Sequence, residues 1–164
     1  MKNAELQSFA DNYNPAIDFE RIKFDWNGQH GDKFEDKNID FRMQLCEFLI
    51  PQIENVKIEL IKDLYTELAK CAEETWGVYN KFHLFAEQLL KRGKTRFLHE
   101  YMKGASLSMD TYLASGRIKI SQGFAYEILN YMIEREKISS DKEELQMLEF
   151  FKERFEWHAN NNTL

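Results

Sequence analysis

The stretch from Ile39 to Trp76 decides the fold: IDFRMQLCEFLIPQIENVKIELIKDLYTELAKCAEETW. Its apolar residues recur at steps of three and four, which is the period of one face of an α-helix. That face consists of Phe41, Leu45, Phe48, Leu49, Ile53, Val56, Leu60, Leu64, Leu68 and Ala72. Pro51 lacks a backbone N–H, so it predicts a kink or a split within this helix. Gly77 predicts where the helix stops.

Shorter helical patterns flank this stretch on both sides. They cover residues 4–13, 80–93, 95–104 and 108–116, and two more begin at Ser121 and Asp141. The side chains of Asn80, Thr95, Ser108, Ser121 and Asp141 can each accept a hydrogen bond from the first turn of a helix. The patterns therefore predict an all-α, single-domain bundle of five to six substantial helices, orthogonal or up-down, over residues 1–164. The tail, residues 160–164, is expected to fray.

Length and composition agree with one globular domain. The chain has 164 residues, of which 43% are hydrophobic and 30% charged. A chain of this length can bury roughly 68–70% of its unfolded surface. Only two prolines and seven glycines are present, which argues against an all-β fold because such folds need many tight turns.

The first 37 residues form an irregular, aromatic N-terminal arm beyond the short first helix. Within it Ile22, Phe24 and Trp26 alternate with polar residues, which is the period of a β-strand. The sequence 118–120 shows the same short alternation. Two arrangements follow: a small two-stranded β pairing of these segments, or an aromatic arm lying across a helical bundle.

The net charge of −6 is unevenly distributed along the chain. Residues 1–76 carry −7, residues 77–120 carry +5 and residues 121–164 carry −4. An acidic protein is repelled by phosphates, so nucleic acid and anionic membrane surfaces are poor partners and a basic protein suits it better.

Leader and membrane-spanning segments are not evident in the sequence. The first 13 residues lack the apolar core of a signal peptide, and no apolar run approaches the roughly 18 residues that span a bilayer. Cys46 and Cys71 fall in helical patterns and are expected to be buried thiols in a reducing compartment. A cytoplasmic location is the simplest interpretation.

Motifs for common catalytic and metal sites are incomplete. His99-Glu100 begins like a zinc-protease helix, but Lys103 stands where the second histidine would be. Gly104-Ala-Ser-Leu-Ser108 begins like a nucleophile elbow but lacks the closing glycine. We therefore assign no catalytic residue, metal ligand or cofactor, and a non-enzymatic role is favoured.

Two local clusters offer alternatives. Lys91, Arg92, Lys94 and Arg96 could hold nucleic acid, or could simply favour the carbonyl end of a helix.

A possible enzyme site involves Asp110, Tyr112 and Arg117, which lie in a polar stretch beginning at Ser106. In the plainer interpretation Ser108 caps a short helix and Asp110 sits in its first turn.

The acidic row Glu59, Asp63 and Glu67 is spaced by four residues and lines one face of the long helix. It is either a solvated face or a surface for a basic partner. Trp26 and the other aromatic residues of the arm either cover the core or anchor a partner. We predict that Glu59, Asp63, Glu67 and Trp26 are the partner-binding residues.

The leading hypothesis is a non-enzymatic protein-binding module that holds a basic partner through acidic helical faces and aromatic anchors. No family motif can be quoted from the sequence. A small, acidic, helical single domain resembles bacterial immunity proteins in general build, and these neutralise toxins by binding them. This likeness concerns build alone. The alternatives are the small enzyme and the nucleic-acid accessory protein named above.

Overall fold

A computed structural model describes residues 2–161, and this part of the chain is all-α, as predicted. The α-helices are α1 (Lys2–Asn12), α2 (Pro15–Asp18), α3 (Ile39–Leu49), α4 (Ile58–Thr75), α5 (Phe82–Gly93), α6 (Leu98–Ala105), α7 (Met109–Ser115), α8 (Gln122–Ile138) and α9 (Lys142–Asn160). Short 3-10 helices are η1 (Phe19–Arg21), η2 (Gly31–Lys33), η3 (Ile50–Asn55) and η4 (Lys94–Phe97). Six of the described α-helices, α1, α3, α4, α5, α8 and α9, have eleven residues or more.

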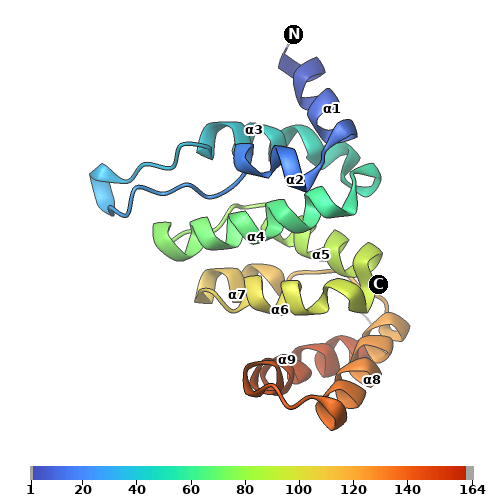
Figure 1. Cartoon of the computed structure of the whole chain (residues 1–164). Helices are drawn as coiled ribbons and strands as arrows, with labels where there is room; N and C mark the ends of the chain where they lie inside the picture. The colour runs from blue at the N-terminus through green and yellow to red at the C-terminus, as the bar shows by residue number, and fades with distance from the viewer. Residues whose placement is uncertain (1, 162–164) are drawn as a thin grey trace.

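The helices are stacked in space in nearly the order of the chain (Figure 1). The blue end holds α1 to α3, the green and yellow helices α4 to α7 form the middle, and α8 and α9 form the other end. Contacts follow this order, because α4 packs on α5 and α8 packs on α9. No helix in residues 2–161 is both long and apolar enough to cross a membrane.

The long helical stretch is divided where Pro51 predicts, but its C-terminal cap differs from the expected glycine. Pro51 splits it, because α3 ends at Leu49, η3 follows, and α4 begins at Ile58. At the other end the left-handed cap is Trp76 (φ 55°), not Gly77.

Tyr65 lies at the centre of the core. It is fully buried on α4, its ring stacks 4.7 Å from that of Phe82, and its Oη donates a hydrogen bond to the carbonyl oxygen of Tyr101 at 2.7 Å. A Cβ atom at position 104 would lie 2.5 Å from Cε1 of Tyr65, so Gly104 is needed for α6 to approach α4.

Three of the five expected helix caps are present. The side chains of Ser108, Ser121 and Asp141 accept hydrogen bonds from the first turns of α7, α8 and α9. Asn80 and Thr95 do not hold these positions, because α5 begins after Lys81 and residues 94–97 form η4.

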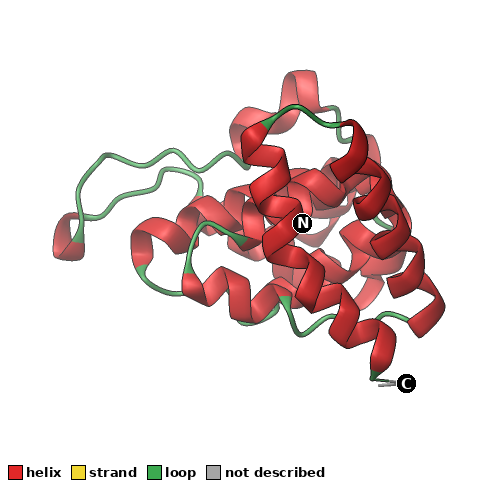
Figure 2. Ribbon diagram, turned by 90° about the horizontal axis from the view of Figure 1, so that it is seen from below, coloured by secondary structure: helices red, strands yellow, loops and turns green. Residues whose placement is uncertain are grey.

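Residues 22–38, which we call the arm loop, reach away from the helices and fold back on themselves (Figure 2). Of the two arrangements considered for the N-terminal arm, the β pairing with 118–120 is not present in residues 2–161. Ile22, Ile118 and Ile120 are buried in the core, and the isolated β-bridge found in residues 2–161 pairs Trp26 with Asp36 inside the arm loop.

A buried ion pair closes the base of the arm loop. The side chains of Arg42 on α3 and of Asp36 are both inaccessible to solvent, and Nη2 of Arg42 donates to Oδ2 of Asp36. Nη1 of Arg42 also donates to the carbonyl oxygens of Ile22 and Lys23, at 3.2 and 3.3 Å. At the far end of the chain Asn160 closes α9, and residues 162–164 of the tail that was expected to fray lie outside the described residues.

Candidate functional site

Four apolar side chains that are each more than half exposed lie on α7 and α9: Met109, Leu113, Phe150 and Trp157. We call this surface the α7–α9 face. Met109 and Leu113 are one turn apart on α7, and Phe150 and Trp157 are two turns apart on α9. The half-buried Tyr112 joins the two helices, since its ring centroid lies 5.1 Å from that of Phe150. Exposed apolar groups of this kind mark interaction sites when polar residues surround them.

Carboxylates lie beside these apolar side chains. Glu149, Glu153 and Glu156 follow the same side of α9 at steps of four and three residues, and all are exposed. Asp110 is exposed next to Met109. None of these four carboxylates takes part in an ion pair or hydrogen bond within residues 2–161. The α7–α9 face therefore combines apolar area with unneutralised negative charge.

The basic residues of this segment of α9 are already engaged. Lys152 pairs with Glu136 at 2.6 Å. Arg154 lies 4.0 Å from the ring centroid of Tyr112, and donates to the Tyr112 carbonyl oxygen at 2.7 Å and to Ser115 Oγ at 2.9 Å. These contacts fix α9 against α7, so the face is held in one arrangement before any partner arrives.

Two histidines, His158 and His83, are expected to make stability depend on pH. Burial lowers the pKa of His158 on α9, and the nearby Arg154 lowers it further. Burial, followed by Arg117, lowers the pKa of His83 on α5. The unfolded chain therefore binds more protons than the folded chain once the pH falls below the ordinary histidine pKa of about 6.5.

We expect the free energy of unfolding to be lower at pH 5.5 than at pH 7.5, measured by urea titration with circular dichroism. His158→Gln should reduce this difference, because it removes a group that is buried uncharged. His99→Gln, at an exposed position on α6, is the matched control. Equal pH dependence in wild type and His158→Gln would contradict the assignment.

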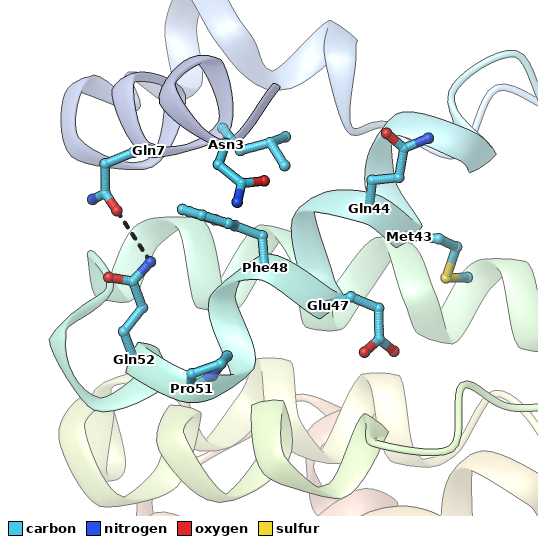
Figure 3. A pocket seen from close by; sticks show the side chains of 9 residues that line it. Asn3, Gln7, Met43, Gln44, Glu47, Phe48, Pro51 and Gln52 are labelled. Carbon is cyan, nitrogen blue, oxygen red and sulfur yellow. Dashed lines mark hydrogen bonds between the residues drawn. The ribbon is translucent and has the colours of Figure 1, made fainter. Parts of the chain in front are cut away.

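An open pocket of about 780 Å³ lies between α1, α3 and η3 (Figure 3). Figure 3 shows the Phe48 ring lying between Asn3 of α1 and Gln52 of η3. Apolar and amide side chains line it: Leu6, Met43, Phe48, Pro51, Asn3, Gln7, Gln44 and Gln52. Its one carboxylate, Glu47, accepts hydrogen bonds from Lys81 at 2.5 Å and Tyr79 at 2.6 Å, and these lower its pKa. Such a lining offers no nucleophile and no free base for catalysis.

The predicted acidic row is not one exposed surface. Asp63 is 7% exposed and Glu67 1% exposed, because the N-terminal segments lie over this side of α4. Tyr13 Oη donates to Asp63 Oδ2 at 2.7 Å, and the backbone N–H of Phe24 donates to Glu67 Oε2 at 2.7 Å. Lys62 and Lys70 pair with the two carboxylates.

The acids of this row differ in how far they are buried. Burial and the hydrogen bond to Asp63 raise the pKa of Tyr13. Glu59 keeps a side chain that is 42% exposed, and it lies 3.5 Å from Arg96. Of the three acids, Glu59 alone retains an accessible carboxylate, while Asp63 and Glu67 join the N-terminal segments to α4.

Trp26 is half-buried within the arm loop. Its ring lies 4.9 Å from His30, 6.2 Å from Phe24 and 6.4 Å from Phe34, and its Nε1 donates to the carbonyl oxygen of Gln29 at 2.9 Å. The indole therefore orders the arm loop, and its role in partner binding stays a prediction.

Three of the four residues in the basic cluster make side-chain contacts within the chain. Lys91 pairs with Glu87 at 2.7 Å, and Arg96 lies near Glu59 and over the ring of Phe97. Arg92 donates to the carbonyl oxygens of Ile53 and Val56, at 3.2 and 2.5 Å. The Lys94 side chain is exposed without an ion pair or hydrogen bond in residues 2–161, and the Arg96 side chain remains 67% exposed, so these contacts engage only part of the cluster.

The polar stretch around Asp110 does not converge on a common point. Ser108 caps α7 through a reciprocal pair of hydrogen bonds with Thr111. Asp110 and Tyr112 are two residues apart on this helix, which directs their side chains about 200° apart. Arg117 is exposed beyond the end of α7. This arrangement does not bring an acid and a base together.

No group of three or more His, Cys, Asp and Glu side chains in residues 2–161 is placed to hold a metal ion. Comparison of the chain with protein-family models, curated proteins and solved structures found no match.

Proposed function

We propose that this protein is a non-enzymatic protein-binding module that holds a basic partner through the α7–α9 face. One observation carries this proposal: exposed apolar side chains lie directly beside carboxylates that no basic side chain of the described residues neutralises. The partner-binding surface proposed here thus differs from the row of Glu59, Asp63 and Glu67, whose last two members are buried.

The two parts of the face have different roles in binding. Trp157 and Phe150 supply the apolar area that a partner would bury, and large aromatic side chains carry much of the energy in protein interfaces. Glu149, Glu153 and Glu156 attract a basic surface and speed its encounter, an effect that salt weakens. If that basic surface belongs to a toxin, covering it would neutralise the toxin, as an immunity protein does.

Affinity capture at low salt, followed by calorimetry with the purified partner, tests the proposal. We expect a basic partner whose Kd rises at least about tenfold with Trp157→Ala, in the range of an interface hot spot. The triple reversal Glu149→Lys/Glu153→Lys/Glu156→Lys should raise the Kd and make the Kd depend less on salt concentration.

The matched control reverses three exposed acids elsewhere, Asp11→Lys/Glu54→Lys/Glu127→Lys, and should leave the Kd unchanged. Circular dichroism confirms that each variant is folded. If the control weakens binding as much as the α9 reversal does, net charge alone explains the interaction and the α7–α9 face is not the site.

A further inference from the structure

The carbonyl end of α4 combines two features that oppose helix stability with an exposed aromatic side chain. Glu73 and Glu74 lie in its last turn, which holds no basic residue, although negative charge there is repelled by the helix dipole. The cap that follows is Trp76, whose left-handed φ of 55° favours glycine. The Trp76 indole is also 86% exposed. Local features that oppose stability concentrate at functional sites.

These features meet at a pocket of about 500 Å³ between the end of α4 and the tip of the arm loop. Its walls include Phe34, Trp76, His30 and Glu74. Gly31, with a φ of 67°, lets the tip turn back toward α4. His30 joins the two segments, because its Nδ1 lies 3.2 Å from the Glu74 carbonyl oxygen.

The chemistry of this pocket selects for a cation. Aromatic faces attract cations through the negative charge above the ring, and Trp gives the strongest attraction. The Glu74 side chain is 29% exposed, and its Oε2 lies 3.8 Å from Nε2 of His30, so its charge stays uncompensated while that imidazole is neutral. The carbonyl end of the helix adds negative potential. An anion would be repelled by all three. A neutral apolar group would remove the carboxylate from water without offering it a hydrogen bond or a positive charge in return.

We propose that this pocket binds the guanidinium group of an arginine side chain presented by a basic partner. A guanidinium is planar, so it can stack on the Trp76 or Phe34 ring while its edge donates two hydrogen bonds to the Glu74 carboxylate. This inference rests on the proposed function for the origin of the arginine, but it concerns a different surface from the α7–α9 face.

The test uses a small probe, Nα-acetyl-arginine methylamide, titrated into the full-length protein at low salt and followed by NMR. We expect saturable shifts that include the Trp76 indole N–H. The neutral analogue Nα-acetyl-norleucine methylamide should produce none. Glu74→Gln should weaken binding of the arginine probe by about threefold or more, and Trp76→Gly by a similar factor.

Trp76→Gly is an informative variant because glycine accepts the left-handed conformation, so its loss of binding cannot be attributed to unfolding. Trp76→Phe keeps an aromatic face and should retain most of the affinity. Equal shifts with the norleucine analogue, or unchanged binding in both Glu74→Gln and Trp76→Gly, would overturn the proposal.

Trp157→Ala separates the two proposals. This variant should bind the arginine probe as wild type does, because it alters only the α7–α9 face. If the arginine probe binds but no protein partner is found, the pocket proposal stands and the proposed function is refuted. Conversely, if a partner binds the α7–α9 face but the arginine probe does not bind the protein, the proposed function stands and the pocket proposal is refuted.

Discussion

Replacing Asp36 by alanine is expected to lower the free energy of unfolding by about 3–5 kcal/mol, because it leaves the Arg42 guanidinium buried without its counter-charge. Arg42 has no exposed surface, so water cannot replace the lost carboxylate. Asp36 Oδ1 also accepts hydrogen bonds from the backbone N–H groups of Asp25 and Asn38, each at 3.1 Å, and these donors would lose their acceptor. Urea unfolding followed by circular dichroism measures the change.

Asp32→Ala, at an exposed position of the same arm loop, is the matched control and should change stability by no more than about 0.5 kcal/mol. The double variant Asp36→Leu/Arg42→Met removes both charges together. It should be less destabilised than Asp36→Ala, because no unpaired charge stays buried. A loss below about 1 kcal/mol for Asp36→Ala would mean that water reaches Arg42.

Glu67→Ala should lower the free energy of unfolding by about 1.5–3 kcal/mol, the range for buried hydrogen bonds to a charged group. Two donors lose their acceptor, the backbone N–H of Phe24 and the Nζ of Lys70. Because Phe24 belongs to the arm loop, we also expect the amides of residues 22–26 to exchange hydrogen faster in this variant.

Glu59→Ala is the matched control for Glu67→Ala. Both residues lie on α4 and belong to one row by sequence, but Glu59 is partly exposed and its ion pair with Arg96 is long. Its removal should change stability by less than about 1 kcal/mol. Similar losses in the two variants, measured by the same urea titration, would contradict the different environments of these carboxylates.

This pair also shows where sequence reasoning succeeds and where it stops. The spacing of apolar residues correctly predicted α4, and Pro51 correctly predicted its separation from α3. The same reasoning placed Glu67 on a charged face, because spacing within one helix cannot reveal which distant segment covers it. The carboxylates of Asp63 and Glu67 are satisfied by Tyr13 and Phe24, which lie 50 and 43 residues earlier.

The α7–α9 face was missed for a related reason. The sequence analysis predicted α9 as a helix with one buried face from the spacing of Leu145, Leu148, Phe151 and Phe155. It gave no role to Phe150 and Trp157. Their spacing of seven residues, with Glu149, Glu153 and Glu156 alongside, carried a detectable signal. The part played by α7 had no such signal, because only the fold brings Tyr112 to Phe150.

The ordered stacking of the helices bears on how the chain reaches this structure. Most helices pack against neighbours close in sequence, so few long loops must close before favourable contacts form. Proteins built from such local contacts fold in microseconds to milliseconds. A smaller set of contacts is long-range. The Phe24 N–H reaches Glu67 across 43 residues, and Arg154 reaches Tyr101 across 53. Stopped-flow refolding should therefore show helix formation before the long-range contacts, including the docking of Phe24 onto α4.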